Sequence, residues 1–172
     1  MKRQEPEIDR LLGTVDQVMQ RRVAALHPEA PVGDAVRELE RAGVSGGPVV
    51  ESGRVVGMVS FSDLFEAVGV PRARVSTSGP WHRFEHWVGA SPLRVRDVMT
   101  RHVVILQTGT PLSQAAEAMW THGVNRIPIV TPEGTLVGIV ARDDVIRAVA
   151  EAGRRSRAVP AHPGASRMEP DP

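Results

Sequence analysis

The chain has 172 residues, of which 41% are hydrophobic, 24% are charged and only 3% are aromatic. Its 21 basic and 20 acidic residues leave a net charge of +1, which provides no long-range attraction to nucleic acid or to an anionic membrane. Cysteine is absent, which excludes disulfides, a thiol nucleophile and a cysteine-based metal site. Neither a membrane-spanning apolar run nor a signal peptide is evident, so we expect a cytoplasmic protein.

The first half predicts a leading helix followed by a β-α-β-β-α unit. Pro31 suits the first turn of a helix, where a missing N–H costs nothing, and Gly43 suits a helix C-terminus. The predicted elements are a leading helix within 1–13, a helical piece at 14–19, a strand at 23–26, a helix at 31–42, strands at 48–50 and 54–59, and a helix from about Ser62.

Residues 70–93 form a linker between the two halves, with Pro, Ser and Gly typical of a loop. A short helix at 81–87 would place His82 and His86 on one face beside Glu85, together with an aromatic stripe. This pattern lacks a third metal ligand, so we expect a solvated face and no metal site. The aromatic stripe either covers its own domain or forms a partner surface.

The second half repeats the first. Residues 15–23 read Val-Asp-Gln-Val-Met-Gln-Arg-Arg-Val, and residues 95–103, 80 positions later, read Val-Arg-Asp-Val-Met-Thr-Arg-His-Val. One inserted residue then raises the spacing to 81, so that Asp63 corresponds to Asp144. Such a duplication indicates two copies of one small fold about a pseudo-twofold axis. Because each copy has only about 55 residues, we expect the halves to share a core.

The repeated pattern predicts the same elements again. Thr110 is expected to cap the helix that begins at Pro111. The predicted elements are a helical piece at 95–99, a strand at 103–106, a helix at 111–122, strands at 127–130 and 136–140, and a helix from about Arg142. The predicted organisation is a leading helix at 1–13, repeats at 14–69 and 94–151, a linker at 70–93 and a disordered tail at 152–172.

Three motifs occur in the same order in both halves: Val-Met before the first strand, Gly-Val before the proline-containing strand, and Gly-x-x-[Ser/Thr]-x-x-Asp at a strand-to-helix turn. The last reads Gly-Met-Val-Ser-Phe-Ser-Asp at 57–63 and Gly-Ile-Val-Ala-Arg-Asp-Asp at 138–144. In these features the chain resembles a tandem pair of CBS domains (the cystathionine-β-synthase repeat), also called a Bateman module. The resemblance implies an α/β fold of the α+β type, with two β-α-β-β-α repeats about a pseudo-twofold axis.

The resemblance further implies a regulatory module that binds an adenosine-containing ligand in clefts between the repeats, with no required cofactor. It also implies a homodimer formed through the helices, and an unidentified protein partner that responds to the ligand. When the family's pattern is carried over residue by residue, the resemblance implies that the first cleft is lined by Met58, Ser60 and Asp63 together with Val124, Asn125 and Arg126. The second cleft takes Ile139, Arg142 and Asp144 with Val44, Ser45 and Gly46.

The residue types fit such a ligand, especially in the first cleft. Asp63 can accept both ribose hydroxyls, while Ser60 at a helix start and the Arg126 guanidinium suit a phosphate. In the second cleft Ala141 lacks the matching hydroxyl, and Arg142 would have to replace it. The first cleft is therefore the expected ligand site.

Simpler interpretations stand beside these. The aspartates at the two turns could serve only to complement helix dipoles, and Arg126 could be an ordinary surface cation. The whole chain could then be a dimerisation scaffold that binds no ligand. No catalytic motif or glycine-rich phosphate loop occurs, so we do not expect an enzyme.

Overall fold

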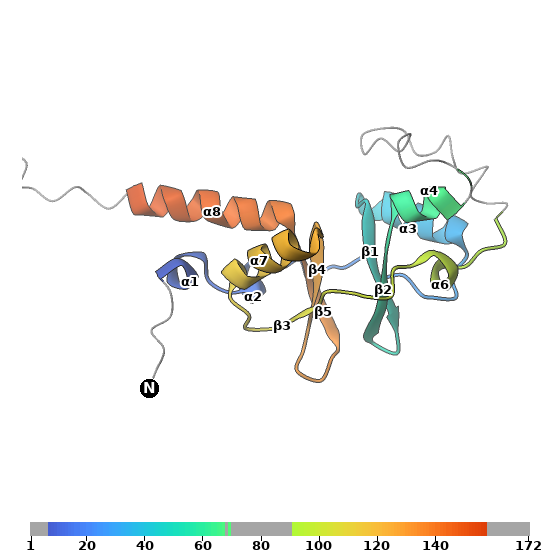
Figure 1. Ribbon diagram of the computed structural model, residues 1–172, viewed down its shortest axis with the longest axis horizontal. Coiled ribbons are helices and arrows are strands. Elements are labelled where there is room, and N and C mark those ends of the chain that lie inside the picture. Colours follow the sequence, from blue (N-terminus) through green and yellow to red (C-terminus); the bar gives the residue numbers. More distant parts are fainter. Residues whose placement is uncertain (1–6, 68, 70–90, 158–172) are drawn as a thin grey trace, which may run out of the picture.

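The computed structural model describes residues 7–67, 69 and 91–157. It confirms two β-α-β-β-α-like repeats, laid side by side with their hairpins at the centre (Figure 1). The predicted helix at 81–87, with its histidines and aromatic residues, lies outside the described residues. The first part of the chain contains α1 (Glu7–Leu12), α2 (Val15–Val18), α3 (Val32–Ala42), β1 (Gly46–Glu51), β2 (Arg54–Ser60) and α4 (Phe61–Ala67). The second contains α6 (Val95–Val98), β3 (Leu106–Gln107), α7 (Leu112–His122), β4 (Arg126–Val130), β5 (Leu136–Ala141) and α8 (Arg142–Arg157).

Each repeat is built on an antiparallel hairpin. β1 pairs with β2, β4 pairs with β5, and each pairing shifts register once, at Val49/Val50 and at Ile129/Val130. β3 adds to β4 in parallel. The two hairpin turns also touch, because the amide of Leu136 donates to the carbonyl of Gly53 at 3.1 Å.

The predicted first strands were too long. The segment 23–26 contributes only one parallel bridge, between Leu26 and Val49, and the segment 103–106 is a strand only from Leu106. The chain before 23–26 is bonded elsewhere, since the amide of Gln20 donates to the carbonyl of Ile139 at 2.9 Å in the other repeat. The segment 23–26 therefore pairs with β1 only through its last residue, Leu26, whose amide donates to a β1 carbonyl.

Glycine ends α3 and α7 as predicted. Gly43 and Gly123 have φ of 66° and 64°, a left-handed conformation that glycine adopts without the steric penalty of a Cβ atom. The N-terminal prediction was wrong in detail, because Pro111 itself is the N-cap of α7. The Thr110 hydroxyl instead donates to the carbonyl of Gln107 at 2.7 Å.

The last helix is longer than predicted. It continues to Arg157, so the start of the tail predicted to be disordered from residue 152 is helical instead. Ala152 is buried, and the helix packs against α1 along this stretch of the chain. The apolar contact with α1 thus keeps the Arg-rich end of α8 helical beyond the second repeat.

The two repeats exchange their leading helices. α2 opens the first repeat but packs into the core of the second, where Val15 is fully buried. α6 opens the second repeat but packs into the core of the first, where Val95 is fully buried. The backbone follows the same exchange, since the amide of Val95 donates to the carbonyl of Ala30 at 2.9 Å. The expected single shared core is thus two separate cores, each completed by a helix from the other repeat.

Glycines in the second strand of each hairpin make room for this exchange. A Cβ atom on Gly57 would lie 2.5 Å from Met99 Sδ, and a Cβ atom on Gly138 would lie 2.5 Å from Met19 Sδ. Each methionine follows one of the exchanged helices. The methionine of the repeated Val-Met motif and the first glycine of the Gly-x-x-[Ser/Thr]-x-x-Asp motif therefore form the two sides of one contact, which occurs twice across the pseudo-twofold axis.

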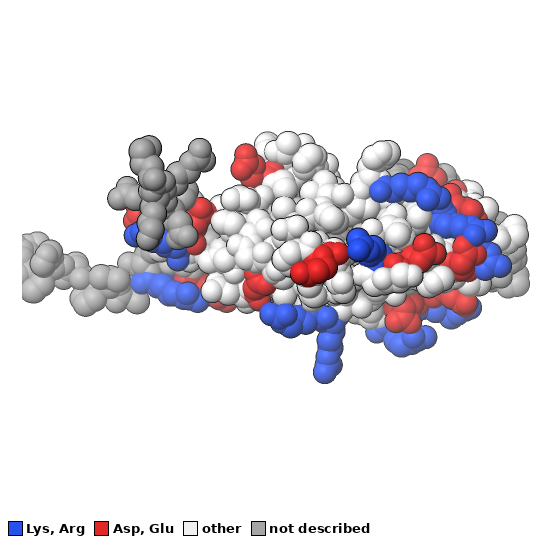
Figure 2. Space-filling model, turned by 90° about the horizontal axis from the view of Figure 1, so that it is seen from below, with Lys and Arg blue, Asp and Glu red and all other residues white. Residues whose placement is uncertain are grey.

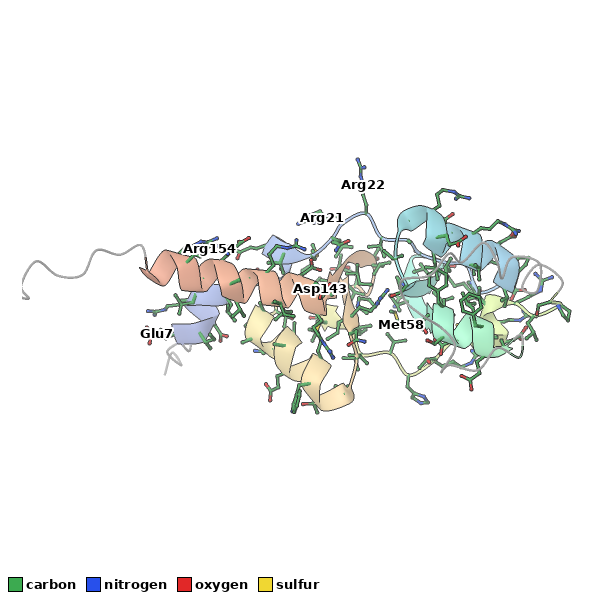
Figure 3. All side chains as sticks on the ribbon, turned by 90° about the horizontal axis from the view of Figure 1, so that it is seen from above. Glu7, Arg21, Arg22, Met58, Asp143 and Arg154 are labelled. Carbon is green, nitrogen blue, oxygen red and sulfur yellow. The ribbon has the colours of Figure 1, made fainter. Side chains whose placement is uncertain are left out.

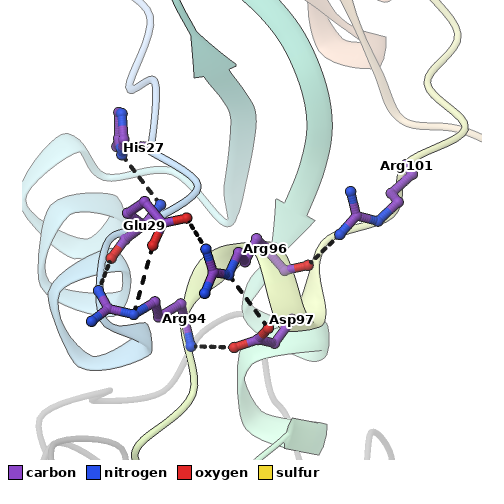
Figure 4. A network of polar contacts seen from close by, with 6 residues as sticks. All are labelled: His27, Glu29, Arg94, Arg96, Asp97 and Arg101. Carbon is purple, nitrogen blue, oxygen red and sulfur yellow. Dashed lines mark hydrogen bonds and ion pairs between the residues drawn. The ribbon is translucent and has the colours of Figure 1, made fainter.

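Ion pairs and hydrogen bonds fix the position of the exposed side of α6. Glu29 accepts from the guanidinium of Arg96, and its carbonyl accepts from Arg94 at 2.5 Å (Figure 4). Charged residues gather at the end of the molecule formed by the first repeat (Figure 2). Because these pairs are about half exposed, they orient α6 more than they stabilise it.

No helix within residues 7–67, 69 and 91–157 is both long and apolar enough to span a membrane.

The exchanged helices generate a stability prediction. Val95→Ala should lower the free energy of unfolding by about 2 kcal/mol, because it removes fully buried methyl groups from the first core. Val98→Ala, one turn later on the same helix and only partly buried, should lower it by less than about 1 kcal/mol. Urea denaturation monitored by circular dichroism measures both values. Equal losses would contradict the central role assigned to Val95.

Candidate functional site

A cavity of about 360 Å³ lies where the turn between β2 and α4 meets the start of β4. All six residues predicted for the first cleft line it, three from each repeat. Tertiary structure therefore brings together segments that are more than 60 residues apart in the sequence. The lining residues are Ser45, Gly46, Met58, Val59, Ser60, Phe61, Ser62, Asp63, Thr100, His102, Val103, Val104, Val124, Asn125 and Arg126.

The Ser-x-x-Asp turn in this cavity is a helix cap. Asp63 Oδ2 accepts from the amide of Ser60 at 2.8 Å and from its hydroxyl at 2.6 Å. The amide of Asp63 in turn approaches Ser60 Oγ at 3.4 Å. This reciprocal arrangement satisfies backbone donors at the start of α4. The simpler interpretation of Asp63 as a helix-start carboxylate is thus correct, and the same side chain also lines the cavity.

Arg126 is not an ordinary surface cation. Its guanidinium donates to the carbonyl of Gly46 and to Ser45 Oγ, the latter at 2.7 Å. Burial lowers its pKa below the ordinary value for arginine, but an arginine remains charged at any physiological pH. Because Gly46 is the residue equivalent to Arg126 in the first repeat, this side chain crosses the pseudo-twofold axis and joins the repeats.

One wall of the first cavity was missed in the sequence. It consists of the segment after α6, with Thr100, His102 and the two valines that follow. Thr100 is tied to the first repeat by two backbone hydrogen bonds of 2.9 Å with Met58. The motifs do not reveal this wall, because its position depends on the exchange of α6.

A second cavity of about 200 Å³ lies across the pseudo-twofold axis. Of the residues predicted for the second cleft, Val44, Ser45, Gly46 and Ile139 line it, and Arg126 contributes to it as well as to the first cavity. Its other lining residues are Gln20, Arg22, Val23, Ala24, Gly43, Gly47, Pro48 and Ala141. The Arg22 side chain points away from the protein body in Figure 3.

The structure does not place Arg142 or Asp144 in the lining of this second cavity. Asp144 is buried with only 3% of its surface exposed, and it accepts from the amide of Ala141 at 2.9 Å. Arg142 is exposed, and its amide donates to the carbonyl of Asn125. Asp144 therefore caps α8, as the simpler interpretation predicted, and no Asp or Glu lines the second cavity.

The described residues contain no cluster of three His, Asp or Glu side chains that could hold a metal ion. The histidine pair at 82 and 86 lies outside them.

Comparison with known proteins identifies the fold. The CBS domain family matches the chain twice, over residues 15–70 and 95–151. The chain belongs to this family. This CBS pair is similar to the CBS-pair protein CBSX2 from Arabidopsis thaliana, with 28% identity, a TM-score of 0.66, and coverage of 82% of this chain and 96% of that one. CBSX2 has also been solved in complex with AMP, and that structure gives 26% identity, a TM-score of 0.65, and coverage of 82% and 98%.

Curated relatives give the same family in different settings. An uncharacterised protein of Methanocaldococcus jannaschii is 30% identical over 133 residues, which cover 67% of this CBS pair and 79% of that protein. An inosine-5'-monophosphate dehydrogenase of the same organism is 28% identical over 133 residues, covering 77% of this chain but 23% of the enzyme. The likeness to that enzyme is therefore limited to less than a quarter of its length.

The buried cap of α8 generates a second prediction. Asp144→Ala should lower the free energy of unfolding by about 1–2 kcal/mol, because the amide of Ala141 loses its acceptor. Arg147→Ala is the matched control, since it removes only an exposed cation 3.7 Å from the same carboxylate. That control should change stability by no more than about 0.5 kcal/mol. If both variants lose the same stability, the ion pair and not the cap is the important contact.

Proposed function

We propose that this CBS pair is a stand-alone regulatory module that binds an adenosine-containing ligand, of the AMP, ADP and ATP class, in the first cavity. The observation that carries the proposal is the set of groups gathered there: the Asp63 carboxylate, the Ser60 hydroxyl and the half-buried Arg126 guanidinium. A volume of about 360 Å³ lies within the usual range for small-molecule sites, whereas the second cavity is smaller. CBSX2 is 26% identical to this chain and has been solved in complex with AMP, which supports the same ligand class.

Each group has a role in the proposed complex. Asp63 accepts hydrogen bonds from the ribose hydroxyls, and the apolar side chains of Met58 and Val124 contact the adenine ring. Arg126 uses two of its five N–H donors on Ser45 and Gly46, so it can meet a phosphate without leaving them. The phosphate then binds beside Arg126, whose remaining N–H donors and positive charge favour an anion.

Ligand binding would change the relative orientation of the two repeats. Each repeat contributes three of the predicted contact residues to the first cavity. A ligand therefore favours the arrangement of the repeats in which both sets of residues contact it. A ligand shifts such an equilibrium only by its difference in affinity for the two arrangements. A protein partner that contacts both repeats would detect this shift.

A second candidate function is a scaffold that binds no nucleotide. The capping geometry of Ser60 and Asp63 favours it, because helix formation alone is sufficient reason for the motif. The two candidates differ in one measurement, which is thermal unfolding with and without AMP, ADP or ATP. A ligand at a hundred times its dissociation constant stabilises the folded state by about 2.7 kcal/mol. No shift with any of the three would favour the scaffold.

The two aspartates should differ in binding. Asp63→Asn removes the charge but keeps an oxygen for the cap, and it should weaken AMP binding by about ten- to a hundred-fold, which corresponds to about 1.5–3 kcal/mol. Asp144→Asn is the matched variant at the second turn, and it should leave the affinity unchanged because Asp144 does not line either cavity. Isothermal titration calorimetry gives both affinities. Equal losses would contradict a site in the first cavity.

Arg126 should determine the preference for phosphate. Arg126→Gln should weaken AMP binding at least ten-fold and leave adenosine binding within about two-fold, because only AMP carries the anion. Adenosine serves as the internal control for folding of the cavity. Arg21→Gln is a second control, at an exposed arginine that lines neither cavity. A parallel loss of both ligands in Arg126→Gln would show that the residue acts only by joining the repeats.

A further inference from the structure

Arg126 carries a positive charge that no carboxylate in the described part of the chain neutralises. Its guanidinium donates to the Ser45 hydroxyl and to the carbonyl of Gly46, which are both neutral groups. The side chain is half-buried, and a charge withdrawn from water is costly unless an opposite charge compensates it. An anion is therefore the group that would complete the surroundings of Arg126.

The guanidinium is accessible from two sides. Arg126, Ser45 and Gly46 each line both cavities, so these three residues form a wall that the cavities share. Two of the five N–H donors of Arg126 are used within the protein, and the others remain for ligands. A ligand in either cavity can thus approach the same positive charge.

The second cavity has the chemistry of an anion site. Hydrogen-bond donors line it on the side chains of Gln20, Arg22, Ser45 and Arg126. No Asp or Glu among the described residues lines it, so it offers no carboxylate for a pair of ribose hydroxyls. Its volume of about 200 Å³ is below the range of about 300–1,000 Å³ that is usual for sites of drug-sized molecules. These properties favour a small anion over a nucleoside.

Two residues belong to the second cavity alone and add to this preference. Ala141 is the cross-strand partner of Arg126 in the β4–β5 hairpin, so no opposite charge faces the guanidinium across the hairpin. Arg22 also lines only this cavity, and its exposed side chain extends into solvent (Figure 3). It gives the cavity a second positive charge, which attracts anions from solution.

We infer that the second cavity binds a small inorganic anion of the phosphate type, held by Arg126 and Arg22, and that this anion competes with AMP for the Arg126 guanidinium. Two phosphates beside one positive charge repel each other. Inorganic phosphate in the second cavity therefore weakens AMP binding in the first, and AMP weakens phosphate binding by the same factor. The anion site depends only on the geometry of the second cavity, whereas the competition rests on the proposed function of the first.

Thermal unfolding of the full chain tests the anion site without any nucleotide. Sodium phosphate is compared with sodium chloride at equal ionic strength, and unfolding is followed by circular dichroism. Phosphate at ten times its dissociation constant should raise the Tm of the wild type by about 3–6 °C. Ala141→Asp, which places a carboxylate opposite Arg126, should abolish this rise. Ala141→Ser adds only a hydroxyl donor at the same position, and it should keep the rise.

Isothermal titration calorimetry tests the competition. Phosphate should weaken AMP binding to the wild type at least five-fold and change adenosine binding by less than about two-fold, because adenosine lacks the anion. Arg22→Gln should reduce this effect of phosphate at least two-fold and leave the AMP affinity in chloride unchanged. Arg21→Gln is the matched control, exposed and outside both cavities, and it should respond to phosphate like the wild type.

The possible results separate the two sites. An equal rise in Tm for Ala141→Asp and the wild type would overturn the inference, because phosphate then acts as a general stabilising salt. Two AMP molecules bound per chain would also overturn it, since the second cavity would then take a nucleotide. Competition that persists in full in Arg22→Gln and Ala141→Asp would place the phosphate in the first cavity and overturn it as well. If neither AMP nor adenosine binds, the proposed function is wrong, and the Tm of the two Ala141 variants still decides the anion site.

Discussion

The exchange of α2 and α6 is the contact on which the rest of the structure depends. Each repeat alone lacks one wall of its core, and the fully buried valines of these helices, Val15 and Val95, supply it from the other repeat. The exchange also directs the chain after α6 along the first repeat, where Thr100 pairs with Met58. That path forms a wall of the first cavity, so the same contact completes the cores and shapes the candidate site.

The pseudo-twofold symmetry is broken where the repeats meet. Arg126 occupies the space that its counterpart, Gly46, leaves on the other side of the axis, and it bonds to that residue's carbonyl. A side chain cannot be added at Gly46 in return, because a Cβ atom there would lie 2.6 Å from the carbonyl oxygen of Val59. Ala141, in place of a hydroxyl residue, adds a second difference. The two cavities are also unequal, because a carboxylate lines the larger one and none lines the smaller.

The Ser-x-x-Asp turn shows how folding and binding use the same groups. Capping of α4 holds Ser60 and Asp63 in fixed positions, so a ligand would meet them already oriented. In the second repeat, Asp144 caps α8 and is buried, but it does not line the second cavity. A motif that is repeated in sequence therefore serves helix formation in both repeats, while only the carboxylate of the first lines one of the two cavities.

The sequence alone determined the duplication, the two hairpins and the glycine helix ends, because each rests on local spacing or on a turn of fixed chemistry. The six residues that line the first cavity were predicted through the resemblance to the CBS family, because they come from segments far apart in the chain. Sequence reasoning could not place the short strands at 23–26 and 103–106 or the two separate cores, since these follow from which repeat each leading helix packs against. It also did not predict that Thr100 and His102 line the first cavity, or that Asp144 does not line the second. Contacts between distant segments decide these features, and they leave no periodic pattern in the chain.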